Sequence, residues 1–134
     1  STTPTIVPTL QPATALPATA FIQDDPVSSL RAYWQAVSSQ HYSDAWPMLS
    51  PNFRWTTHAN DFDAYVQGYM DQGLCDVSPQ EIVVVSNASD YARIDAMMLY
   101  HKGPACAASP LGLIFHMIPA ADRPSWLIDR VELQ

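Results

Sequence analysis

Basic residues are scarce in this chain, and their scarcity excludes several classes of function. The sequence has one lysine and five arginines against thirteen acidic residues, so its formal net charge at neutral pH is −7. A nucleic-acid binder needs clustered lysines and arginines to displace counterions from phosphates, and electrostatic attachment to anionic lipid needs a basic cluster as well. The sequence therefore predicts no nucleic-acid partner and no polybasic contact with a membrane.

Long hydrophobic runs and glycine-rich loops are also missing. No apolar run approaches the roughly 20 residues that a membrane-spanning helix needs, so we expect no direct insertion of this segment into a membrane. The four glycines are scattered and build no phosphate-binding loop. No nucleophile stands beside a base in a recognised pattern, and we expect no cofactor.

Cysteine is limited to Cys75 and Cys106. A disulfide between them would close a loop of about thirty residues and stabilise the fold by roughly 3–4 kcal/mol. Structural zinc prefers four ligands at tighter spacing, so we expect no metal site. We predict the disulfide, and with it an oxidising compartment; two free buried thiols in a cytosolic protein are the alternative.

Charge is absent from the first 23 residues, where threonine, proline and alanine dominate. The prolines at 4, 8, 12 and 17 favour an extended polyproline conformation. We therefore expect residues 1–24 to form a stalk or linker, with a disordered tail as the alternative, and residues 25–134 to form one domain. Such spacers are common on exported proteins, so we predict an extracytoplasmic location. Because the chain starts at Ser1 without a signal peptide, we expect an anchor in missing upstream sequence.

Three helices are predicted in the first half of the domain. An aspartate cap followed by Pro26 starts the first, which ends near residues 38–40. Ser43 is expected to cap a short second helix at 43–49. Asn60 is expected to cap the third, at 60–72. Between the last two, residues 53–55 are expected to be extended at most.

Strands are predicted in the second half, where the apolar period changes to two. The expected strands lie at residues 81–86, 91–101, 111–119 and 126–133, with a loop at 102–110. In the second of them, alanine, isoleucine, methionine and tyrosine alternate with polar or longer side chains. Helices followed by a meander of antiparallel strands indicate an α+β fold.

This order resembles the nuclear-transport-factor-2-like superfamily, which includes the SnoaL-like proteins. The resemblance rests on short stretches in the family's order: SLRAYW at 29–34, HYSDAW at 41–46, SPNF at 50–53, DFDAY at 61–65 and SWLIDRV at 125–131. It implies a curved sheet of about four strands that wraps three helices into a cone, a cystatin-like roll with an internal cavity. Within the superfamily the chain looks most like bacterial extracytoplasmic domains carried on Thr/Pro linkers.

Enzymes of the superfamily, such as ketosteroid isomerase, place acid–base side chains inside the cone. The candidates here are His116, Asp95 and His58, together with Asp61 and Tyr69. His116 and Asp95 approach each other in the cavity only if the face opposite Leu113 and Phe115 lines it; otherwise both lie on the solvent side of the sheet. No position matches an enzyme motif, so the resemblance transfers no catalytic residue.

A second set of side chains is suited to binding an apolar small molecule or a partner peptide. These are Trp55, Tyr65, Tyr69, Met97, Met98 and His116, which otherwise belong to the core. The leading hypothesis is a non-catalytic binding or sensory module outside the cytoplasmic membrane. The alternatives are a small isomerase or dehydratase that uses a histidine with an aspartate, and a structural domain that forms a homodimer.

Overall fold

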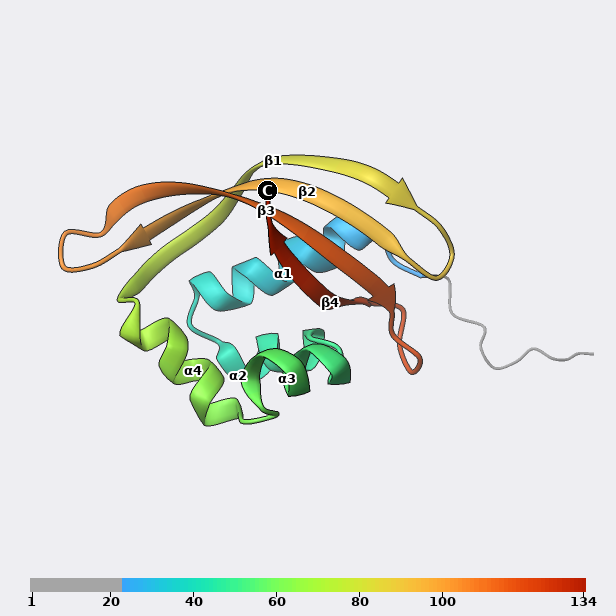
Figure 1. Ribbon diagram of the computed structural model, residues 1–134, viewed down its shortest axis with the longest axis horizontal. Coiled ribbons are helices and arrows are strands. Elements are labelled where there is room, and N and C mark those ends of the chain that lie inside the picture. The colour runs from blue at the N-terminus through green and yellow to red at the C-terminus, as the bar shows by residue number, and fades with distance from the viewer. Residues whose placement is uncertain (1–22) are drawn as a thin grey trace, which may run out of the picture.

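A curved antiparallel sheet arches over the helices, which lie on its concave side (Figure 1). The computed structural model describes residues 23–134, so all but the last two residues of the predicted stalk lie outside the described residues. The helices are α1 (Pro26–Ser38), α2 (Tyr42–Ala45), the 3-10 helix η2 (Trp46–Met48), α3 (Pro51–His58) and α4 (Phe62–Asp71). The strands are β1 (Leu74–Asn87), β2 (Ala92–Lys102), β3 (Ala107–Pro119) and β4 (Trp126–Leu133). The predicted α+β class is confirmed.

Helix α1 begins where the sequence predicts. The side chain of Asp25 accepts a hydrogen bond from the backbone N–H of Val27, at 3.2 Å, and Pro26 occupies the first turn. The helix buries Leu30, Trp34 and other apolar side chains against the sheet. Burial of this face stabilises the helix far more than its intrinsic propensity does, since isolated helices of this length are marginal in water.

The expectation of an extended segment at residues 53–55 is wrong, because these residues lie inside helix α3. Ser50 is the N-cap, and its hydroxyl accepts a hydrogen bond from the N–H of Phe53 at 3.0 Å. Pro51 occupies the first helical position, where its missing N–H is not needed. The Ser-Pro pair therefore starts a helix here.

The two neighbouring helices differ from prediction at their ends. Ser43 lies inside α2 rather than capping it, and the predicted helix continues only as the 3-10 turn η2. Pro47 has no N–H to donate to the preceding turn, which weakens a regular α-helix at that point. Asp61, not Asn60, caps α4, because its carboxylate accepts a hydrogen bond from the N–H of Ala64 at 3.2 Å.

The four strands pair as neighbours in chain order, each antiparallel to the next. Strand β2 alternates as predicted, with Ala92, Ile94, Ala96, Met98 and Tyr100 buried on the concave face. Strands β1 and β3 are longer than predicted, because each pairs along nearly the whole of β2 and shares its backbone hydrogen bonds.

A disulfide joins Cys75 at the start of β1 to Cys106 in the turn between β2 and β3, with Cα atoms 6.1 Å apart. The predicted pairing is present in the structure. Beside it, the N–H of Gly103 donates to the carbonyl of Gly73 at 3.0 Å. Both glycines have positive φ, 62° at Gly73 and 80° at Gly103, which glycine adopts without steric strain. The crosslink thus ties the turn of this hairpin to the start of β1, close behind the end of α4.

Candidate functional site

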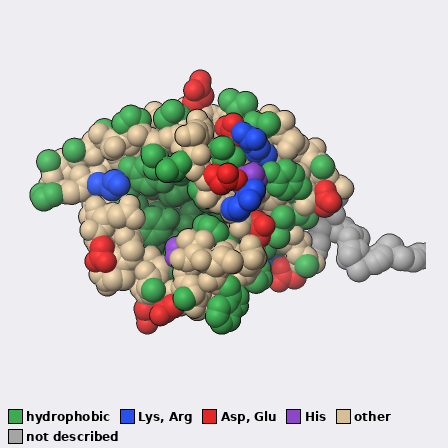
Figure 2. All heavy atoms as spheres, viewed as in Figure 1, with side chains coloured by type: hydrophobic (Ala, Val, Ile, Leu, Met, Phe, Trp, Pro, Cys, Tyr) green, Lys and Arg blue, Asp and Glu red, His purple; other side chains and the backbone are tan. Residues whose placement is uncertain are grey.

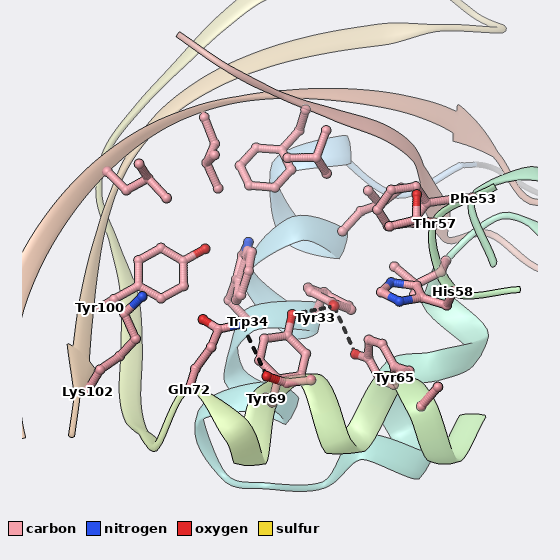
Figure 3. Close-up of a pocket in the computed structure, with 18 residues that line it drawn as sticks. Tyr33, Trp34, Phe53, Thr57, His58, Tyr65, Tyr69, Gln72, Tyr100 and Lys102 are labelled. Atoms are coloured by element: carbon pink, nitrogen blue, oxygen red, sulfur yellow. Dashed lines mark hydrogen bonds between the residues drawn. The ribbon is translucent and has the colours of Figure 1, made fainter. Parts of the chain in front are cut away.

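A cavity of about 350 Å³ lies between the concave face of the sheet and the helices. Figure 2 shows a hollow lined by hydrophobic side chains on this side of the molecule, and Figure 3 shows the side chains around the cavity. Leu111, Leu113 and Phe115 contribute from β3, and Ile128 and Val131 from β4. The helices contribute mainly aromatic rings. The cavity is therefore largely apolar, with polar groups at a few defined positions.

Three tyrosines form a hydrogen-bonded group, the tyrosine triad, on the helical wall of the cavity. The hydroxyl of Tyr33 on α1 lies 2.8 Å from that of Tyr65 and 3.0 Å from that of Tyr69, both on α4 (Figure 3). Three hydroxyls carry three protons, and the two hydrogen bonds within the triad use two of them. One O–H therefore remains to donate outside the triad.

Burial keeps the triad neutral. Desolvation raises the pKa of Tyr65 to about 12, and burial also raises the pKa of Tyr33 and of Tyr69 above the ordinary value of 10.0. At physiological pH the three side chains are thus phenols rather than phenolates. They present a hydrogen-bond donor to the cavity, not a base.

His58, the last residue of α3, lines the same cavity. Its ring centroid lies 5.0 Å from that of Tyr65 and 5.6 Å from that of Phe53, both in edge-on arrangements. Desolvation by these surroundings lowers the pKa of His58 below its ordinary value of 6.5. The imidazole is therefore uncharged at neutral pH and can donate one hydrogen bond and accept another.

Small side chains on α4 leave room at the cavity wall. Ala64 and Gly68, one helical turn apart, both face the cavity. A Cβ atom added at Gly68 would meet no atom within 4 Å. Space beside this glycine is therefore open, and a larger side chain there would enter the cavity rather than clash with the core.

The polar groups at the opposite end of the cavity are Gln72, the C-cap residue of α4, and two side chains of β2 (Figure 3). Tyr100 and Lys102 are two residues apart on one strand, so their side chains share the concave face. The ammonium of Lys102 lies 5.5 Å from the ring centroid of Tyr100. Burial raises the pKa of Tyr100 above its ordinary value, so this hydroxyl is also a neutral donor.

The indole of Trp34 adds an unpaired donor to the cavity wall. Its Nε1 atom is buried and has no hydrogen-bond partner among the described residues. Figure 3 shows this nitrogen at the end of the ring that faces the cavity and the sheet. A buried N–H without an acceptor is unfavourable by about 1–3 kcal/mol.

The convex face of the sheet carries a separate polar cluster. Nδ1 of His116 lies 2.5 Å from the hydroxyl of Tyr91, and Nε2 lies 2.5 Å from a carboxylate oxygen of Glu132. Arg93 forms an ion pair with Asp95 at 3.0 Å. Neither His116 nor Asp95 lines the cavity. Because side chains alternate along a strand, His116 and Asp95 lie on the face of the sheet that points away from the helices. This is the second of the two arrangements that the sequence left open.

The candidate residues named from the sequence thus separate into two groups. Tyr65, Tyr69 and His58 line the cavity. Trp55 is 64% exposed on the outer side of α3, and Met97 is 38% exposed on the convex face of β2. Like His116 and Asp95, Trp55 and Met97 do not line the cavity.

Other cavity residues were not found by sequence reasoning. Tyr33 was passed over, although it precedes Trp34 in the first predicted helix and lies on the same buried side. Thr57 and Phe53 were missed because helix α3 itself was not predicted. The alternation of the second predicted strand assigns Tyr100 to one face of it but to no site, and Lys102, the only lysine, is given no role by the sequence analysis.

Neither a membrane-spanning helix nor a metal cluster is seen in the described residues. No helix between residues 23 and 134 is both long and apolar enough to cross a bilayer. Within the same residues, no three side chains of the types His, Cys, Asp and Glu come together as a set of metal ligands.

Similarity to known proteins is confined to the fold. No protein-family model and no curated protein sequence matches the chain. A solved ketosteroid isomerase-like protein from Erwinia carotovora atroseptica matches in structure with a TM-score of 0.55 at 14% identity. The match covers 79% of this chain and 89% of that one. The chain therefore has the nuclear-transport-factor-2-like fold that the order of its elements predicted.

Proposed function

We propose that this chain is a binding module that holds a small, mainly apolar molecule in the cavity beneath its sheet. The observation that carries the proposal is the cavity itself, about 350 Å³ and lined mostly by aromatic and aliphatic side chains. Ligand pockets in proteins have this size and this composition, with a few polar groups that set the orientation of the ligand. Here the triad, His58, Trp34 and Tyr100 supply such groups.

The polar groups favour binding over catalysis. The triad and Tyr100 are neutral donors, and none of the described residues that line the cavity is an aspartate or a glutamate. The sequence hypothesis of an isomerase or dehydratase required a histidine and an aspartate that converge in the cavity. His58 has no such partner there, so a second proposal of that type has less support than ligand binding.

A location outside the cytoplasm belongs to the same proposal. The disulfide between Cys75 and Cys106 supports it, because such bonds persist in oxidising compartments and are rare in the cytosol. The uncharged, Thr/Pro-rich composition of residues 1–22 supports a tether that holds the domain away from an anchor. We propose that the module acts there as a sensor or carrier for its ligand.

Fluorescence of the neutral dye N-phenyl-1-naphthylamine tests the binding proposal. We expect the dye to bind the wild-type protein, and the Gly68→Phe variant to bind it at least about tenfold more weakly, since the phenyl ring would occupy the open space beside α4. Gly68→Ala is the matched control, because its Cβ enters the same open space and leaves the cavity unfilled. Its dye affinity should equal that of wild type.

Two results would contradict the proposal. One is the absence of dye binding by the wild-type protein. The other is equal dye affinity in Gly68→Phe and Gly68→Ala, provided that both variants unfold cooperatively in urea as wild type does. In the second case the dye would sit elsewhere on the surface.

A further inference from the structure

Lys102 is an isolated cation at the cavity. It is the only lysine of the chain and the only basic side chain besides His58 among the residues that line the cavity. Arg93, Arg123 and Arg130 form ion pairs with carboxylates, whereas Lys102 forms none within residues 23–134. A cation without a carboxylate partner within the described residues is free to pair with an anion from outside the chain.

The surroundings of Lys102 suit the head of an anionic ligand. Its ammonium group has three donors and is held near the Tyr100 ring, at 5.5 Å from the centroid, by a cation–π contact. The Tyr100 hydroxyl faces the cavity as well (Figure 3) and has no hydrogen-bond partner among the described residues. A carboxylate at this end would therefore meet one charged donor and one neutral donor.

The rest of the cavity suits an apolar body. Away from Lys102 the wall passes to Leu113 and Phe115 on the sheet side and to Phe53 on α3. An aliphatic or aromatic group buried there would gain roughly 25 cal/mol for each Å² removed from water. A second charge on this part of the ligand would be unfavourable, because no oppositely charged side chain of the described chain lines it.

We propose that the ligand of this cavity is an amphipathic monoanion, a carboxylic acid with an apolar body, whose carboxylate pairs with Lys102. The inference depends on the proposed binding function and adds the chemical class of the ligand. A neutral apolar molecule of the same shape would bind more weakly, because it cannot form the ion pair with Lys102. Anions with no apolar body lack the burial that the other end of the cavity provides.

Neighbouring covalent and backbone contacts hold Lys102 at this position. In the sheet it pairs with Leu74 on β1 and with Ala107 on β3. The next residue, Gly103, is hydrogen-bonded to Gly73, and the disulfide from Cys75 to Cys106 crosses the same end of the hairpin. The backbone that presents the cation is thus ordered before a ligand arrives, which lowers the entropic cost of binding.

Displacement of N-phenyl-1-naphthylamine by decanoate and by decanol tests the inference. The two competitors share an alkyl chain and differ in charge, and both are used below their aggregation concentrations at neutral pH. In Lys102→Met, which keeps an apolar stem and removes the charge, we expect decanoate affinity to fall about fivefold to tenfold. Decanol affinity should stay at the wild-type value.

Two further variants separate the ion pair from general effects of charge. Lys102→Arg restores a cation at the cavity and should retain most of the decanoate affinity. Arg31→Met removes an exposed cation of α1 that does not line the cavity, and it should leave the affinities for both competitors unchanged. Added salt should weaken decanoate binding to wild type more than decanol binding.

The outcomes distinguish the two proposals. If the dye binds and Gly68→Phe blocks it, but Lys102→Met binds decanoate as wild type does, the cavity binds ligands and the selection for a carboxylate is wrong. An equal loss of decanoate affinity in Arg31→Met would also overturn it, since the effect would then follow net charge. If the dye does not bind wild type at all, the binding function itself fails, and the inference fails with it.

Discussion

Tyr33 is the side chain on which the hydroxyl arrangement of the cavity depends. It is 3% exposed, and its oxygen is the only one that contacts both other hydroxyls of the triad. Tyr65 and Tyr69 lie on consecutive turns of α4 and pack edge-on, with ring centroids 5.4 Å apart, but each hydroxyl forms its hydrogen bond to Tyr33. The orientation of the remaining free O–H of the triad therefore follows from this residue.

Removing the Tyr33 hydroxyl should destabilise the protein. Tyr33→Phe leaves the hydroxyls of Tyr65 and Tyr69 without a partner in the triad, and we expect the free energy of unfolding in urea to fall by about 2 kcal/mol. Tyr42→Phe is the matched control: Tyr42 is also buried, at 8% exposure, and its hydroxyl has no hydrogen bond among the described residues. A loss of equal size in both variants would show that the triad adds nothing specific to stability.

His58 should make stability depend on pH. Burial lowers its pKa in the folded protein below the unfolded value of 6.5, so the unfolded chain takes up a proton first as the pH falls. The contribution of neutral His58 is therefore complete above about pH 6.5 and decreases as the solution is acidified through the folded pKa. His58→Gln should show a smaller loss of stability over that interval.

Urea unfolding at a series of pH values measures the effect of His58. His41→Gln is the control, because His41 is exposed and lies outside the cavity. The assignment fails if the His58→Gln and wild-type curves run parallel from neutral pH to about pH 5.

At the scale of elements, two connections determine the shape of the cavity. Ser50 joins α3 to β4, since its hydroxyl caps the helix and also donates to a carboxylate oxygen of Asp129 at 2.6 Å. Its backbone N–H donates to the carbonyl of Ile128 at 2.9 Å. These bonds place the helix that carries Phe53, Thr57 and His58 against the last strand. At the other end, the disulfide ties β1 to the hairpin that carries Lys102.

Removal of the disulfide should therefore lower both the stability of the protein and its affinity for decanoate. The bond joins residues 31 apart in sequence, and the double variant Cys75→Ser, Cys106→Ser should lose about 3–4 kcal/mol in the free energy of unfolding. Decanoate affinity should also fall, because the Lys102 hairpin loses its crosslink. Wild type should show no free thiol when titrated under denaturing, non-reducing conditions. Two titratable thiols in that assay would contradict both the bond and the proposed compartment.

At the scale of the whole molecule, the fold separates two kinds of surface on one sheet. The concave face meets the helices and encloses an apolar cavity. The convex face carries two ion pairs, Arg93 with Asp95 and Arg130 with Glu132. The similarity to a ketosteroid isomerase-like protein at 14% identity shows that this architecture tolerates very different sequences. Function in such a fold resides in the side chains that line the cavity, not in the architecture.

Local patterns in the sequence were enough for much of this architecture. The two-residue period of β2, the bounds of β4 and the aspartate cap of α1 were predicted because each depends on neighbours along the chain. Helix α3 was missed because the Ser-Pro pair is compatible with both a turn and a helix start. Its hydrogen bond to Asp129, 79 residues away, lies outside any local pattern.

The amino-acid sequence alone determined the α+β order of elements, the acidic balance that disfavours nucleic acid, and the two cysteines available for a crosslink. Only the tertiary structure decided which side of the sheet encloses space, and so which candidates share a site. It placed His116 and Asp95 outside and brought Tyr33, His58 and Lys102 to one cavity. Strand alternation shows that two faces differ, but the curvature of the sheet and the packing of distant helices decide which face becomes a pocket.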